Sequence, residues 1–121
     1  MRYMLLIYDD EKLWAEMSET ERQKIFGEYM QFSSDIRRTG NYQAGAPLQP
    51  TSAATSVRVR DGKRVVTDGP YAETREQLGG YYLVDAKDLD EAIALAARIP
   101  AARIGTVEVR PVMELPAAVN S

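Results

Sequence analysis

The chain has 121 residues, of which 45% are hydrophobic and 27% charged, with a formal net charge of −3 and a pI near 5.0. These values are typical of one globular domain, and the acidic balance argues against a nucleic-acid partner, which requires a basic face for phosphates. The sequence contains no cysteine and no histidine. Disulfides, thiolate chemistry, sulfur-ligated metals and the commonest general base near neutral pH are therefore excluded.

The N-terminus predicts neither a signal peptide nor a metal loop. The apolar run Met4–Tyr8 is too short for a signal sequence, and Asp9, Asp10 and Glu11 follow at once. These three acids lack the spaced ligands of a calcium loop, so we expect a solvated turn. No segment approaches the roughly 20 apolar residues of a membrane span. We therefore expect a cytoplasmic protein without a membrane partner, a metal or a cofactor.

The first predicted elements are a strand, a loop and a long helix. Arg2–Tyr8 is apolar on both faces, which is typical of a central strand, and Asp9–Met17 is expected to form a loop. Ser18 and Glu21 form a capping box, from which the helix runs to about Thr39. We interpret the apolar stripe of this helix as core packing rather than as an aromatic cofactor slot. The stripe consists of Ile25, Tyr29, Phe32 and Ile36, widened by Phe26 and Met30.

A short edge strand and a hairpin are predicted next. Asn41–Leu48 contains a glycine and a proline, which favour an irregular edge strand, and Gln49–Ala54 is expected to be a loop. Thr55–Arg60 and Lys63–Thr67 form a hairpin around the turn signal Asp61-Gly62.

The hairpin register has two alternatives. A two-residue turn sets Val57 opposite Val66, whereas a three-residue loop with a bulge at Gly62 sets it opposite Val65. We favour the second alternative, because Val57, Val59 and Val65 then share one face.

The C-terminal part predicts a strand at Tyr81–Ala86, a helix capped at Asp88 that runs to about Ile99, and a strand at Thr106–Arg110. With the hairpin set aside, the order of elements is the α+β, ferredoxin-like split βαβ pattern. Both helices cover one face of the sheet, and the apolar second face indicates a two-fold dimer. We expect residues 1–115 to form one domain and 116–121 to be a mobile tail.

The stretch Thr67–Tyr82 is the part least explained by folding needs. Its order of residues in Asp68–Thr74 and Glu76–Tyr82 resembles the signature of the YCII-related family, in its DGPF-domain branch, with Tyr71 where that branch usually has Phe. The resemblance extends over nearly the whole chain. It implies a dimeric α+β barrel in a family without a settled biochemical role. Branch members are often encoded beside extracytoplasmic-function sigma factors, which implies a link to stress regulation.

The signature supplies the first candidate site residues. Asp68 stands at a rigid corner with Gly69 and Pro70, and a carboxyl held there acts as acid or base if burial raises its pKa. The alternative is an ordinary turn residue that bonds local backbone amides. Glu73 is a second candidate carboxylate, and Arg75 is a candidate anchor for an anionic ligand.

The remaining candidates lie beside the corner or on strands. Either Tyr81 or Tyr82 faces the barrel interior, because neighbouring residues alternate across a sheet. Glu108 and Arg110 either satisfy each other or contact the partner subunit. The full set of candidate ligand-binding residues is Tyr8, Arg58, Gly69, Pro70, Tyr71, Arg75, Tyr81, Tyr82, Glu108 and Arg110.

Two functions are compatible with these residues. The first is a small-molecule-binding dimeric barrel with carboxylate-dependent proton transfer, isomerase- or lyase-like, in which Asp68 acts on a small acidic or aromatic ligand. The second is a non-enzymatic sensor or accessory protein linked to a sigma factor. A buried Asp68 favours the first function, and an exposed Asp68 bonded to its own turn favours a structural role.

Overall fold

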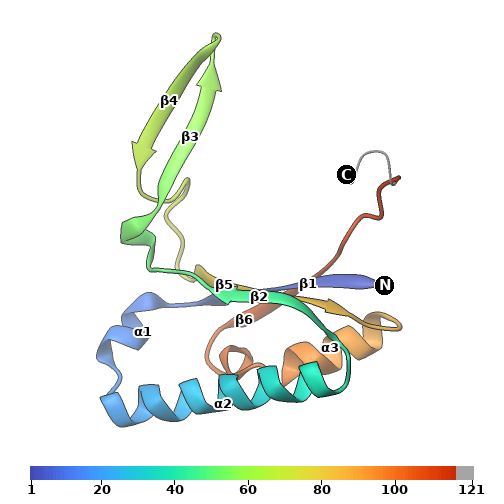
Figure 1. The fold of residues 1–121 in the computed structure, drawn as a ribbon. Helices are drawn as coiled ribbons and strands as arrows, with labels where there is room; N and C mark the ends of the chain where they lie inside the picture. The colour runs from blue at the N-terminus through green and yellow to red at the C-terminus, as the bar shows by residue number, and fades with distance from the viewer. Residues whose placement is uncertain (117–121) are drawn as a thin grey trace.

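The computed structural model describes residues 1–116 and contains a four-stranded antiparallel sheet, helices on one of its faces and a separate hairpin (Figure 1). The elements are β1 (Arg2–Asp9), α1 (Glu11–Glu16), α2 (Glu19–Arg38), β2 (Tyr42–Pro47), β3 (Thr55–Arg60), β4 (Lys63–Asp68), β5 (Gln77–Asp85), α3 (Leu89–Ala97) and β6 (Thr106–Pro111). The strand order β2-β5-β1-β6 confirms the predicted ferredoxin-like topology, with β3–β4 as the inserted hairpin.

The hydrophobic core lies between the sheet and the helices. Residues of β1 alternate between buried and partly exposed, because only one face of the sheet is covered. The core comprises Tyr3, Leu5 and Ile7 of β1, Phe32 and Ile36 of α2, Tyr82 and Val84 of β5, Ala92, Leu95 and Ala96 of α3, and Ala86, Ile99 and Ala101 in the segments beside α3.

The opposite face of the sheet carries partly exposed apolar side chains. It comprises Met4, Leu6, Tyr8, Tyr81 and Leu83, of which Leu6 pairs with Tyr81 and Met4 with Leu83 across β1 and β5. We call these five residues the bare face. The hairpin and the segment after β6 both project from this side of the sheet, away from the helices (Figure 1).

Helix α2 begins and ends as predicted. The Ser18 hydroxyl accepts a hydrogen bond from the Glu21 amide at 3.1 Å, and Gly40 has a φ of 81° just after the helix. The predicted wide apolar stripe is wrong in part, because Phe26 and Met30 are 65% and 58% exposed. On the surface of α2, these two side chains lie beside the row of Tyr29, Phe32 and Ile36 that packs against the sheet.

The largest differences between predicted and observed boundaries are at α1, β5 and α3. Residues 11–16 form α1 instead of a loop, because the Asp10 side chain caps it by accepting from the Lys12 amide at 2.9 Å. Strand β5 begins at Gln77 rather than at Tyr81, because its first residues continue the ladder with β1, where Leu78 pairs with Tyr8 and Gln77 with Asp9. Gly80 permits a close approach of β2. A Cβ at Gly80 would lie 3.1 Å from the Ala46 carbonyl oxygen. Helix α3 ends at Ala97, before a 3₁₀ turn at Pro100–Arg103.

The hairpin register differs as well. Val57 pairs with Val66, and not with Val65 as favoured from the sequence. Asp61 and Gly62 both have positive φ, 52° and 74°, which a two-residue turn requires and which these residue types tolerate without a bulge.

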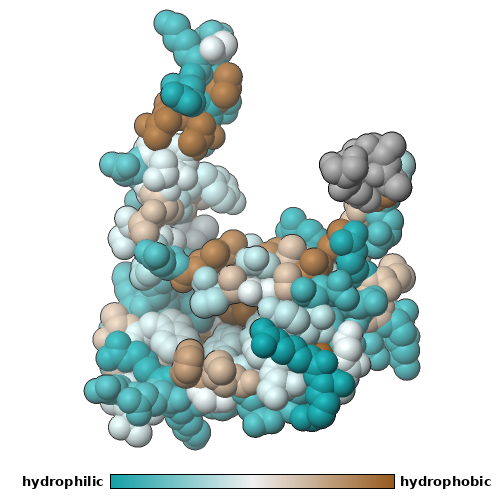
Figure 2. Space-filling view, viewed as in Figure 1, coloured by the Kyte–Doolittle hydropathy of each residue, from teal (hydrophilic) through white to brown (hydrophobic). Residues whose placement is uncertain are grey.

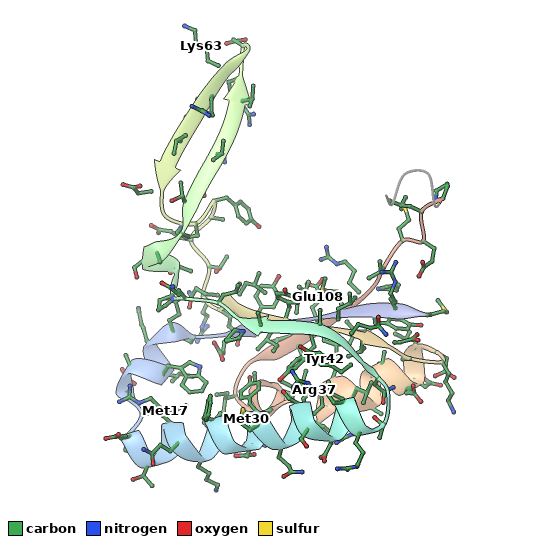
Figure 3. All side chains as sticks on the ribbon, viewed as in Figure 1. Met17, Met30, Arg37, Tyr42, Lys63 and Glu108 are labelled. Carbon is green, nitrogen blue, oxygen red and sulfur yellow. The ribbon has the colours of Figure 1, made fainter. Side chains whose placement is uncertain are left out.

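The hairpin, residues 55–68, is therefore an arm with one apolar face. Val57, Val59 and Val66 share that face and are 58%, 62% and 56% exposed. Figure 2 shows this hydrophobic cluster on the projecting arm, above the body of the molecule. Lys63 marks the tip in Figure 3.

None of the helices within residues 1–116 combines the length and the apolar character that crossing a membrane requires. The predicted mobile tail, 116–121, lies outside the described residues from position 117 onward.

Replacing two different glycines by alanine should change the stability in opposite directions. An added Cβ at Gly27, in the exposed middle of α2, meets nothing within 4 Å, so Gly27→Ala should raise the free energy of unfolding by about 0.5–1 kcal/mol. A Cβ at Gly105 would overlap the Tyr8 carbonyl oxygen, so Gly105→Ala should cost about 1–3 kcal/mol. Urea denaturation measures both changes. A neutral Gly105→Ala would contradict the packing of this turn on β1.

Candidate functional site

A cleft of about 970 Å³ lies between α2 and the β2–β5 edge of the sheet. One side of α2 forms a wall, with Phe26, Met30, Ser33 and Arg37 at helical spacing. Figure 3 shows Met30, Arg37 and Tyr42 between the helix and the sheet. The opposite wall consists of Gly45–Pro50, and Gly79–Tyr82 line the cleft from β5.

The cleft exists because small residues leave the space between helix and sheet unfilled. A Cβ at Gly45 would lie 2.8 Å from Cδ1 of Tyr82, so glycine is needed to seat that ring. Ser33 reaches Tyr82 through a hydroxyl–hydroxyl hydrogen bond of 2.7 Å. The Tyr82 ring also meets Phe32 edge-on, with centroids 5.2 Å apart. Tyr82 therefore faces the helices, and Tyr81 faces the opposite side.

Asp9 is the buried carboxyl of the cleft. It is 6% exposed, and it lines the cleft at the end of β1. Its Oδ2 accepts a hydrogen bond from the Trp14 indole Nε1 at 2.8 Å. This placement corrects the prediction that Asp9 belongs to a solvated turn. The strand continues one residue further than expected, so its alternation carries Asp9 to the same side as Ile7.

The surroundings of Asp9 disfavour its charged form. Burial raises the pKa of the Asp9 carboxyl, and the charges of Glu76, Glu11 and Asp10 raise it further, while the Trp14 hydrogen bond opposes them. Burial also raises the pKa of Tyr29 to about 12, with a contribution from the Asp9 charge. Tyr29 is therefore a proton-bearing hydroxyl at neutral pH and not a base.

Helix α1 is braced by the second half of the signature. The Glu11 carboxylate accepts from the Thr51 amide at 2.8 Å and from its hydroxyl at 3.0 Å. The Glu11 amide donates to Gln77 Oε1 at 2.9 Å. Gln77 in turn donates to the Thr74 carbonyl, and Glu76 accepts from the Thr106 hydroxyl at 3.0 Å. These bonds hold Trp14 over the end of β1.

The first half of the signature lies away from the cleft. Asp68 is exposed at the end of β4, opposite Thr55. The corner is held by hydrogen bonds to the backbone of Gly69: its amide donates to the Ala54 carbonyl at 2.7 Å, and the Ser56 hydroxyl donates to its carbonyl at 2.7 Å. Exposed residues around it are Pro70, Tyr71, Glu73 and Arg75.

The other predicted site residues are divided between surfaces. Tyr8 lies on the bare face, and Arg58 is exposed on the arm. Glu108 and Arg110 form an ion pair with each other, and Glu108 lies on the side of the sheet away from the helices (Figure 3). Among the predicted site residues, Tyr82 borders the cleft from the helix side of the sheet, and Tyr81 touches its lining although its side chain alternates to the bare face.

Sequence reasoning missed Asp9 and Trp14. The alternation Tyr3, Leu5, Ile7, Asp9 was a signal for an inward-facing carboxyl. The chain's single tryptophan five residues later was a further signal, because an indole needs an acceptor when it is partly buried.

The structure thus defines a ferredoxin-like α+β protein with an open cleft and a buried carboxyl in its wall. The model of the YCII-related domain matches residues 1–116. "Uncharacterized protein R00369" of Rhizobium meliloti (strain 1021) is 37% identical over 113 residues, which cover 92% of this chain and 91% of the relative. The chain belongs to the YCII-related family, so the predicted family is confirmed, while the DGPF-domain branch stays a prediction.

Asp9→Asn tests the burial of this carboxyl. Because the folded pKa lies above the usual value of 3.8, the wild-type free energy of unfolding falls as the pH rises from about 3.8 through the raised pKa. Asn removes the charge and keeps an acceptor for Trp14. We expect Asp9→Asn to be more stable than wild type at neutral pH, with the gain shrinking at acid pH, in urea denaturation at a series of pH values.

Asp61→Asn is the matched control, because it makes the same chemical change at an exposed turn residue with positive φ. It should leave the pH dependence unchanged. A variant Asp9→Asn that is less stable than wild type at neutral pH would show that the carboxylate contributes to folding, contrary to this account.

Proposed function

We propose that the chain binds a small molecule in the cleft and that Asp9 exchanges a proton with it. The burial of Asp9 in the wall of an open cleft carries this proposal. A desolvated carboxyl without a cationic partner costs folding stability. Such groups are concentrated at functional sites, where a shifted pKa serves the chemistry.

The geometry around Asp9 suits an acid or base. Oδ2 is fixed by Trp14, while Oδ1 has no hydrogen-bond partner among residues 1–116 and is not enclosed. A raised pKa brings the carboxyl closer to neutrality, where general acid–base catalysis is most effective. Proton transfer at a carbon beside a carbonyl, as in isomerases and lyases, needs one such group. The neutral hydroxyl of Tyr29, whose pKa the Asp9 charge raises, also lines the cleft.

Asp68 has weaker support for this role. Its side chain is exposed in the described chain, and the corner that holds it is built from backbone hydrogen bonds. Asp68 stays a prediction as acid or base, and it is tested beside Asp9 below.

We also propose that two copies pair through their bare faces and form an α+β barrel. The support is the row of apolar side chains on a sheet face that no helix covers. The arm and the segment after β6 project from the same side (Figure 1), so a second copy would lie between them. A closed two-fold pair is the commonest way to cover such a face.

A non-enzymatic sensor or accessory protein, linked to sigma-factor stress regulation in the cytoplasm, is the second candidate function. The arm favours it. A two-stranded hairpin is marginally stable alone, yet Val57, Val59 and Val66 are exposed on this one. Such a face suits contact with another protein.

A thermal-shift screen of small acidic, aromatic and carbonyl compounds tests the site. A ligand at about a hundred times its dissociation constant contributes roughly 2.7 kcal/mol of stability. We expect hits to lose their shift or their turnover in Asp9→Asn and to keep both in Asp68→Asn. Turnover lost with affinity kept identifies an enzyme. Hits that respond only to Asp68→Asn would move the site to the corner and contradict the assignment to Asp9.

Leu6→Asp tests the pairing of bare faces. Leu6 lies opposite Glu108 on β6, so an added carboxylate in a closed interface would be repelled as well as desolvated. We expect wild type to sediment as a dimer and Leu6→Asp as a folded monomer. Ile93→Asp is the control, because Ile93 is 49% exposed on α3, and it should remain dimeric. A monomeric wild type would overturn the proposal.

A further inference from the structure

The Asp9 carboxyl is surrounded by acids. Three charged groups raise the pKa of Asp9: Glu76, which directly precedes β5, Glu11, the first residue of α1, and Asp10, the N-cap residue of that helix. No lysine or arginine among residues 1–116 forms an ion pair with it. From α2, Tyr29 lies close enough for the Asp9 charge to raise the pKa of its hydroxyl, and that hydroxyl is neutral at neutral pH. A buried anion in proteins is normally paired, so this end of the cleft lacks a cation.

The two arginines of the cleft do not supply that cation. Arg37 is stacked over the Tyr42 ring, 4.4 Å from its centroid, at the first residue of β2. Asp9 lies beyond the other end of that strand, because Pro47 pairs with Gly80 and Asp9 with Gln77. Arg22 borders the cleft without an ion pair to Asp9.

A metal ion does not fit the site either. Within the described part of the chain, no three carboxylates lie close enough together to hold one. The walls of the cleft are instead aromatic and apolar, with Trp14, Phe26, Tyr29 and Met30 among the lining residues. Aromatic faces attract organic cations, and Phe26 is 65% exposed without a protein partner that covers it.

We propose that the Asp9 end of the cleft binds a protonated amine carried on an apolar or aromatic body. The ammonium group donates to Oδ1, while Trp14 holds Oδ2 and the body lies along Phe26 and Met30. The proposal rests on the proposed function in one respect, namely that the cleft is the ligand site.

Trp14 supplies the measurement, because it is the single tryptophan of the chain and its indole touches Asp9. The probes are phenethylamine, phenethyl alcohol and phenylpropionate, which share a body and differ in charge. We expect the amine to change Trp14 fluorescence saturably and to bind more tightly than the other two. Asp9→Asn should weaken the amine about tenfold or more, as expected for a hydrogen bond between charged groups.

Two further variants make the result specific. Gly79→Ala places a Cβ 3.5 Å from Asp9 Oδ1, so it narrows the ammonium position at ordinary contact distance and should weaken the amine while the charge is kept. Asp61→Asn, distant on the arm, should bind as wild type does. Amine affinity should also fall as the pH is lowered through the raised pKa of Asp9, and this dependence should vanish in Asp9→Asn.

Failure of this proposal is distinguishable from failure of the proposed function. If the alcohol or the acid binds as tightly as the amine and binding still depends on Gly79→Ala, the cleft is the site and the cationic class is wrong. If the amine binds equally to wild type, Asp9→Asn and Gly79→Ala, or if none of the probes changes Trp14 fluorescence, the amine site is overturned. Ligands from the thermal-shift screen then decide whether the cleft binds at all.

Discussion

The alternation of side chains along β1 is the constraint on which the rest of the structure depends. Tyr3, Leu5 and Ile7 point to the helices and build the core, and the intervening residues build the bare face. The same period delivers Asp9 to the covered side at the strand's last position. A shift of one residue would bury Tyr8 and expose Asp9. The register of β1 therefore determines the core, the bare face and the burial of the Asp9 carboxyl together.

Holding a carboxyl at the end of a central strand requires support from several segments. Gly105 lets the turn before β6 approach the Tyr8 carbonyl, which a Cβ would prevent. The Glu11 side chain fastens α1 to Thr51, and its amide is fastened to Gln77. The second half of the signature thus both braces the cleft, through Gln77, and lines it, through residues 79–82.

The elements and topology were predictable because each rests on local chemistry: the Ser18 cap, the Gly40 stop and the apolar runs of β1 and β5. The hairpin register was not predictable, because two turn types suit Asp61-Gly62 and only the backbone angles distinguish one turn type from the other. Asp9 was misjudged because three acids in a row are typical of a solvated turn. Its burial depends on a helix, α1, which begins at the Asp10 cap and is fastened by contacts to residues 51 and 77.

The positions of the cleft and the bare face bear on the choice between enzyme and sensor. They lie on opposite sides of one sheet, and β5 contributes Tyr82 to the first and Tyr81 to the second. A proton-transfer enzyme needs the cleft alone. A sensor must have a ligand whose affinity differs between two states of the protein, and linkage makes that coupling reciprocal. Since Tyr82 and Tyr81 are adjacent residues of β5 that face the two sides of the sheet, coupling between the cleft and the bare face would have only the thickness of the sheet to cross.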